Sequence, residues 1–161
     1  MSALTEDLSK YSFGVTSAIV TSLALMLGLQ TLRDPKTSII GALVIIAIAD
    51  NISDSLGIHI YRESQGPETA GDTRVYTVSN FLTRLSIIAL FIALVFVLPL
   101  EFAVVLSTAI GLTLLFVLSY YIAISRKQNV PQTIAQHLGI AVVAIVLSHF
   151  LGQAIAGIFH V

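Results

Sequence analysis

Five apolar stretches, each about as long as a membrane helix, dominate this sequence. They cover Ser12–Leu32, Ser38–Ile60, Val78–Leu98, Leu100–Ile124 and Ile134–Phe159. A helix needs about 20 mostly apolar residues to cross about 30 Å of hydrocarbon, so each stretch is long enough to span a bilayer. Each gap between them holds one of the four prolines, Pro35, Pro67, Pro99 and Pro131. Because proline favours a break in a helix, we predict an all-α integral membrane protein with five transmembrane helices in a single domain, residues 1–161.

The composition supports lipid as the solvent and excludes several classes of function. Hydrophobic residues make up 56% of the chain and charged residues 11%, whereas a soluble domain is about a quarter charged. The net charge of −1 and the lack of a basic stripe argue against a nucleic-acid partner. The absence of cysteine excludes disulfides and thiolate metal ligands. Glu6 and Asp7 precede the first apolar stretch, which is too long for a signal peptide, so we expect it to be retained.

The distribution of lysine and arginine predicts the orientation in the membrane. One side collects Lys10, Arg62, Arg74, Arg126 and Lys127, and the other collects only Arg33 and Lys36. Positive residues accumulate on the cytoplasmic side of membrane proteins. We therefore expect the N-terminus in the cytoplasm and the C-terminus outside, with the cell membrane as the host membrane.

The second apolar stretch contains two acidic residues, Asp50 and Asp54, which lie four positions apart and so share one helical face. At about 1.5 Å per residue, they lie roughly 15 Å and 9 Å from the cytoplasmic end of this stretch. Two carboxylates one turn apart repel each other unless a cation or a proton intervenes. The pair therefore predicts a site that binds a divalent cation such as Fe²⁺ or Mn²⁺ in exchange for protons, with Asn51 and Ser17 adding neutral oxygen ligands.

The same acids also allow a structural interpretation, in which Arg84 of the third stretch is the ion-pair partner of Asp54. This arginine lies at about the depth of Asp54 on the neighbouring antiparallel helix, where the two side chains could form an ion pair. Such a pair would join the two helices but would leave Asp50 unexplained. The functional interpretation therefore comes first, and the ion pair remains open beside it.

Three further polar residues are weaker candidates for ion access or proton relay. His59 and Glu63 lie four apart at the inner edge of the second stretch, and imidazole and carboxylate both bind Fe²⁺ or Mn²⁺. Solvated residues at the membrane interface are the simpler interpretation of this pair. His149 shares a face with Gln153 deep in the fifth stretch. There a hydrogen bond between helices is the simpler interpretation.

Four segments resemble motifs of the vacuolar iron transporter family. The similar segments are Ile19–Gly28, Ala49–Gln65, Val97–Leu100 and Gly139–Gly157. In the second of them, Ser53 and Gly57 match the serine and the glycine of the family motif. The resemblance covers most of the chain and implies a five-span dimer that exchanges Fe²⁺ or Mn²⁺ for protons along a pathway at the dimer axis.

The chain departs from this family at the positions that matter most for metal. The family's first-span aspartate falls on Ser17, its second-span methionine on Asp54, and its following glutamate on Ile58. The acidic helical domain between the second and third spans is missing. The resemblance therefore supports the family's fold more strongly than its metal site. The membrane-embedded acids of this chain are Asp50 and Asp54 instead.

Three hypotheses follow. The first is a homodimeric transporter that moves Fe²⁺ or Mn²⁺ out of the cytoplasm in exchange for protons, with no permanently bound cofactor. The second is a non-transporting membrane scaffold or subunit of the same fold. The third, an intramembrane metal-dependent enzyme, is disfavoured because Asp50 and Asp54 lack the partner residues of such enzymes, and we expect no enzymatic activity. Acids that face a dimer axis would favour transport, whereas pairing of both acids with Arg84 would favour the scaffold.

Overall fold

The computed structural model describes residues 2–65 and 70–159, and this part of the chain is helical without strands. The elements are α1 (Ser2–Leu29), α2 (Pro35–Ile45), a π-helical turn η1 (Ile46–Asp50), α3 (Asn51–Ser64), α4 (Ala70–Val97), α5 (Leu100–Ser125) and α6 (Val130–Phe159). Because α2, η1 and α3 follow one another without a break, they form one long span. Five segments are long and apolar enough to cross a membrane, as the sequence predicts.

The helix boundaries differ from the predicted ones mainly at polar helix starts. Helix α4 begins at Ala70, before the expected Val78, and α6 begins at Val130, before the expected Ile134. Hydropathy underestimates such ends because polar residues can extend a helix beyond the hydrocarbon. Pro131 lies in the first turn of α6 instead of in a gap, where its missing N–H leaves no helical bond unmade. Pro35 opens α2, Pro99 directly precedes α5, and Pro67 lies outside the described residues.

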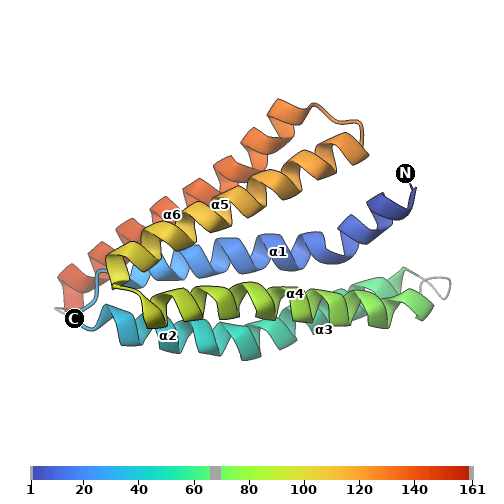
Figure 1. Ribbon diagram of the computed structural model, residues 1–161. Helices are drawn as coiled ribbons and strands as arrows, with labels where there is room; N and C mark the ends of the chain where they lie inside the picture. Colours follow the sequence, from blue (N-terminus) through green and yellow to red (C-terminus); the bar gives the residue numbers. More distant parts are fainter. Residues whose placement is uncertain (1, 66–69, 160–161) are drawn as a thin grey trace.

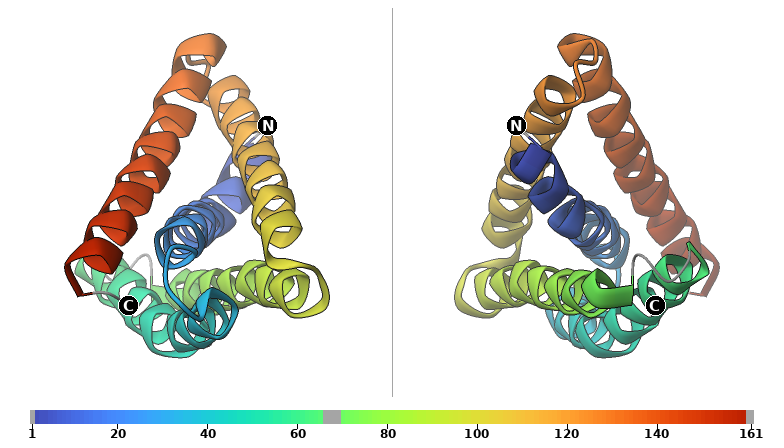
Figure 2. Two further views of the ribbon diagram at one scale, coloured as in Figure 1. Left: turned by 90° about the vertical axis from the view of Figure 1, so that its left-hand side faces the viewer. Right: turned by 90° about the vertical axis from the view of Figure 1, so that its right-hand side faces the viewer.

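Helix α1 is the central helix of the bundle. It packs against α4, α5 and α6 along its length and also contacts α2. The end-on views show α5 and α6 along two sides of a triangle and the α2–α4 group along the third, with α1 inside it (Figure 2). The N-terminus lies at the same end of the bundle as the end of α3, and the C-terminus lies at the opposite end (Figure 1). An odd number of spans requires this separation of the termini.

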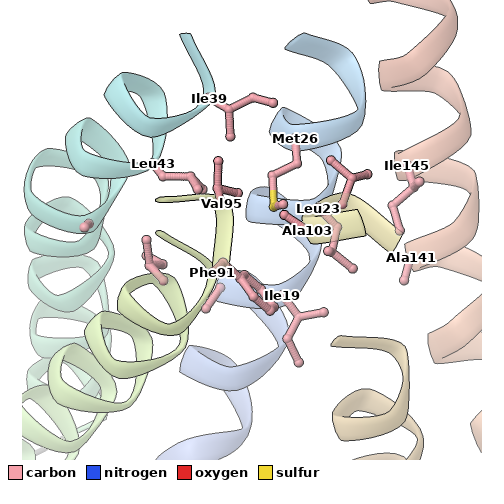
Figure 3. Close-up of a cluster of buried hydrophobic side chains, with 14 of the residues drawn as sticks. Ile19, Leu23, Met26, Ile39, Leu43, Phe91, Val95, Ala103, Ala141 and Ile145 are labelled. Carbon is pink, nitrogen blue, oxygen red and sulfur yellow. The ribbon is translucent and has the colours of Figure 1, made fainter. Parts of the chain in front are cut away.

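The apolar core fills the half of the bundle that lies near the C-terminus. Leu43 of α2, Phe91 and Val95 of α4 and Met26 of α1 meet there, and each of these side chains is fully buried (Figure 3). A fully buried side chain of this size contributes about 1.5–3 kcal/mol in water, but lipid is as apolar as leucine. In a membrane these contacts therefore stabilise the bundle through close packing and not through escape from water.

Two glycines allow α1 and α6 to approach closely. A Cβ atom added at Gly152 would lie 2.0 Å from the carbonyl oxygen of Gly28, and one added at Gly28 would lie 3.1 Å from the carbonyl oxygen of Ser148. The neighbouring atoms are backbone, which cannot move aside as a flexible side chain can. Small residues at helix crossings give membrane helices their closest contacts, and this crossing is of that kind.

We expect Gly152→Ala to separate α1 from α6 and to destabilise the protein by about 1–3 kcal/mol, the usual range for overpacking. Thermal unfolding in detergent measures this as a lower Tm. Gly157→Ala, one of the open positions on the same helix, is the matched control because nothing lies within 4 Å of its added Cβ. Equal Tm values for the two variants would show that the crossing tolerates a methyl group.

Candidate functional site

Asp50, Asp54 and Arg84 form an ion-paired triad where the η1–α3 segment packs against α4. Arg84 Nη2 donates to Asp50 Oδ2, and Arg84 Nη1 contacts Asp54 Oδ2. The planar guanidinium group therefore uses its two terminal nitrogens on the two acids, one each. The ion pair between Asp54 and Arg84 that the sequence suggests is present, and Asp50, which that interpretation left unexplained, pairs with the same arginine.

Ser17 of α1 completes the triad. Arg84 Nη1 donates to Ser17 Oγ at 2.9 Å, and the Ser17 hydroxyl donates to Asp54 Oδ2 at 3.2 Å. The site is thus built from the central helix, from the η1–α3 segment and from α4. Ser17 lies beside the acids, where its oxygen accepts from Arg84, and its role as a neutral ligand of a metal ion stays a prediction.

The three charged side chains differ strongly in exposure. The side chain of Arg84 is 1% exposed, that of Asp54 28% and that of Asp50 44%. Arg84 lies 11 residues after Thr73, where the apolar part of α4 begins, and 13 before its last residue, Val97. At about 1.5 Å per residue it is therefore roughly 16–20 Å from either end. The triad lies near the middle of the span with its arginine enclosed and Asp50 the most accessible acid.

The local sequence explains why both acids reach one arginine. The spacing of four places Asp50 and Asp54 on one face, and the antiparallel pairing with α4 brings Arg84 opposite them. Lys36 donates to the carbonyl of Leu98 at 3.2 Å in the same register. The π-helical turn η1 ends at Asp50, and such turns are rare insertions that recur at functional sites.

Asn51 does not join the acids. Its side chain is fully buried, and its amide nitrogen donates to the carbonyl oxygens of Ala47 at 3.3 Å and Phe81 at 3.0 Å. The predicted role of Asn51 as a ligand beside Asp50 is therefore not supported by its position. The reason is the helical step of about 100° between neighbours, which turns Asn51 toward the α4 backbone while Asp50 faces Arg84.

His59 and Glu63 meet as the sequence suggests, but away from the triad. His59 Nε2 lies 3.2 Å from Glu63 Oε1, and His59 Nδ1 lies 3.2 Å from Thr77 Oγ1 of α4. Thr77 was not singled out in the sequence. The antiparallel register that pairs Asp50 with Arg84 would have placed it opposite His59.

His149 forms hydrogen bonds between helices, which agrees with the simpler interpretation of this residue. Its Nδ1 lies 3.3 Å from Gln30 Nε2 and 3.4 Å from the carbonyl oxygen of Leu27 in α1, and its Nε2 lies 3.1 Å from Gln153 Nε2. Gln30, which was not singled out in the sequence, follows the last residue of α1. These contacts join α1 to α6 and do not include the triad.

The acids fit a metal ion only in part. Among the side chains that the structure describes, no three histidine, aspartate or glutamate groups lie close enough together to hold a metal. Asp50 and Asp54 supply two oxygen donors and Ser17 a third neutral one, but the guanidinium of Arg84 occupies the space between the carboxylates. A divalent cation therefore needs Arg84 to release at least one acid before it can bind.

The fold and the site define an all-helical protein with five helices long and apolar enough to span a membrane and with a charged triad around a buried arginine. No protein-family model, no curated protein and no solved structure matches this chain. The likeness to vacuolar iron transporters therefore rests on the four similar segments of the sequence alone.

Proposed function

We propose that this chain is a membrane transporter that moves a divalent transition-metal cation, Fe²⁺ or Mn²⁺, out of the cytoplasm in exchange for protons at the triad of Asp50, Asp54 and Arg84. The observation that carries this proposal is the charge of the triad. Two carboxylates share one guanidinium, so the group has a net charge of −1 near the middle of a membrane span. An uncompensated charge at that depth is unfavourable by several kcal/mol.

One exchangeable positive charge removes this imbalance. A proton on either acid makes the triad neutral, with one carboxylic acid, one carboxylate and one guanidinium. A divalent ion that replaces this proton leaves the three side chains with a net charge of +1. Its binding therefore requires that Arg84 withdraws from at least one acid and that a further negative group, supplied by a second chain, balances the excess charge. Arg84 then acts as a tethered cation that holds the acids between ions.

The exposure of Asp50 supports a dimer. Its side chain is 44% exposed in the single chain, at a depth where lipid would otherwise cover it. A charged ion on this route must be screened from lipid. A second copy that covers this surface would screen the ion and could complete a ligand set for which one chain supplies two acids.

A non-transporting scaffold remains the second candidate because Arg84 pairs with both acids. Pairing of both acids with Arg84 is the arrangement expected for a scaffold, so this contact favours a structural role. The charge count weighs against it, since a single acid would suffice to neutralise Arg84, and a second one adds a charge that a scaffold does not need.

Transport into sealed vesicles separates the two candidates. The purified protein is reconstituted into proteoliposomes, and Mn²⁺ uptake is followed with a pH gradient and after collapse of the gradient by a protonophore. We expect uptake that depends on the gradient and exceeds that of protein-free vesicles. Uptake equal to that of protein-free vesicles under both conditions would favour the scaffold.

A further inference from the structure

The buried face of α4 changes from polar to apolar at the triad. Before the triad it carries polar residues, and after it only apolar ones. In chain order the buried residues are Thr73, Tyr76, Asn80 and Arg84, then Ile88, Phe91 and Val95. All seven follow the spacing of three or four that defines one helical face.

In the span that faces α4, formed by α2, η1 and α3, the buried residues change along the chain from apolar to polar. Its buried residues are Ile39, Leu43 and Ala47, then Asn51 and Ser55. Since the two spans are antiparallel, the polar halves face each other on one side of the triad and the apolar halves face each other on the other side. The seam between the spans is therefore polar toward the end of α3 and apolar toward the start of α2.

We infer that the polar half of this seam, lined by Ser55, Asn80, Thr77 and His59, is the access pathway by which protons and cations reach the triad, and that the apolar half closes the triad to the other side. This inference deepens the proposed function, because it names the residues and the side of the membrane through which the triad exchanges its positive charge.

Hydrogen bonds between polar side chains occur at two levels of the seam, between the helix end and the triad. His59 joins Glu63 to Thr77, each at 3.2 Å. One turn further in, Asn80 Nδ2 donates to Ser55 Oγ at 3.2 Å. Ser55 is the neighbour of Asp54, and Asn80 lies one turn before Arg84, so the next step is the triad itself.

Polar atoms along the inner part of the seam have free hydrogen-bonding capacity. Asn51 Oδ1, Asn80 Oδ1 and Arg84 Nε are buried without a hydrogen-bond partner, and the three residues are each fully buried. A buried polar atom without a partner is unfavourable, most of all in a membrane. Water that moves along the seam would satisfy these atoms and would carry protons between His59 and the acids.

A groove accompanies the outer part of the seam. It has a volume of about 390 Å³ and a mainly apolar wall, in which Ser55, His59 and Thr77 are the polar residues. In the opposite half of the seam, the buried side chains that the structure describes are apolar. Ile39, Leu43 and Phe91 are fully buried there and belong to one apolar cluster (Figure 3). Charged species do not cross such a layer without a change of conformation.

Thiol labelling tests the pathway directly, because the chain contains no cysteine of its own. Ser55→Cys and Val95→Cys are each placed in lipid nanodiscs, where a charged thiosulfonate reagent reaches both membrane faces. Depth alone favours Val95, which lies two residues from the end of α4, whereas Ser55 lies nine residues from the end of α3. Asn80→Cys is a second polar-side variant in case Ser55→Cys does not fold, and labelling after denaturation confirms that each thiol is present.

We expect Ser55→Cys to react at least about tenfold faster than Val95→Cys, because the thiolate is the reacting form and apolar burial suppresses it. Labelling at equal rates, or faster labelling of Val95→Cys, would overturn the pathway. If the polar-side cysteines stay unlabelled while wild-type vesicles still take up Mn²⁺, the pathway is wrong and the exchange proposal stands. If they react but wild-type vesicles take up no Mn²⁺, the pathway is supported and the exchange proposal fails.

Discussion

We expect Asp50→Asn to abolish Mn²⁺ uptake into proteoliposomes while the protein remains folded and dimeric. The substitution leaves Asp54 and Arg84 as a neutral pair, so the triad no longer lacks a positive charge and has no site for an exchangeable proton. Loss of a direct ligand is worth at least the roughly 10–100-fold that outer-shell partners of metal ligands contribute. We therefore expect a fall in the initial uptake rate of at least about 100-fold.

Glu101→Gln provides the matched control for this loss. Glu101 is an exposed acid in the first turn of α5, so the substitution makes the same change of acid to amide outside the triad. We expect its uptake rate to equal that of the wild type. Size-exclusion chromatography and thermal unfolding in detergent establish that both variants are folded. Unchanged uptake in Asp50→Asn would remove this acid from the mechanism.

Arg84→Gln has the largest expected effect on stability. The substitution leaves two carboxylates facing each other in the membrane without a cation, and removing one partner of a buried ion pair is destabilising by about 3–5 kcal/mol. Asp54→Asn removes a charge of the opposite sign and leaves Asp50 paired with Arg84. We expect a clearly smaller loss from Asp54→Asn, measured as the shift of the unfolding midpoint in detergent at neutral pH.

A double variant tests whether charge is the cause of this difference. Arg84→Gln combined with Asp54→Asn restores the net charge of −1 that the three side chains of the wild-type triad have without an exchangeable proton or cation. We expect the double variant to be more stable than Arg84→Gln alone, so that the second substitution rescues the first. An unfolding midpoint equal to or below that of Arg84→Gln would mean that packing of the guanidinium, and not the charge balance, is responsible.

The sequence predicts the number of spans well because apolar length and proline positions are local signals. It also offers Arg84 as an alternative partner of Asp54, since depth and the order of the helices can be estimated from residue counts. The predicted first residues of α4 and α6 are too late in the sequence. Hydropathy detects only the apolar part of a helix, and both helices begin with polar turns outside it. The π-helical turn before Asp50 has no signal of its own, since neither glycine nor proline occurs in it.

The site is less predictable than the fold because it depends on which side chains face each other. Ser17 reaches the acids from α1, a helix whose position inside the bundle follows from packing with α4, α5 and α6. Asn51 was assigned to the acids by sequence proximity, but the helical step turns it to Phe81. Arg84 pairs with both acids, and this could not be predicted from sequence spacing because it depends on the exact positions of the three side chains.

The protonation state of the acids is the most direct test of the central claim that the triad holds one exchangeable positive charge. Infrared spectra of the reconstituted wild-type protein at neutral pH should contain the band of a protonated carboxylic acid, and Mn²⁺ should remove it. The same band should be absent from Asp50→Asn, where Asp54 and Arg84 neutralise each other. A wild-type protein without this band, or a band that ignores Mn²⁺ and persists in Asp50→Asn, would contradict the exchange of a positive charge at this triad.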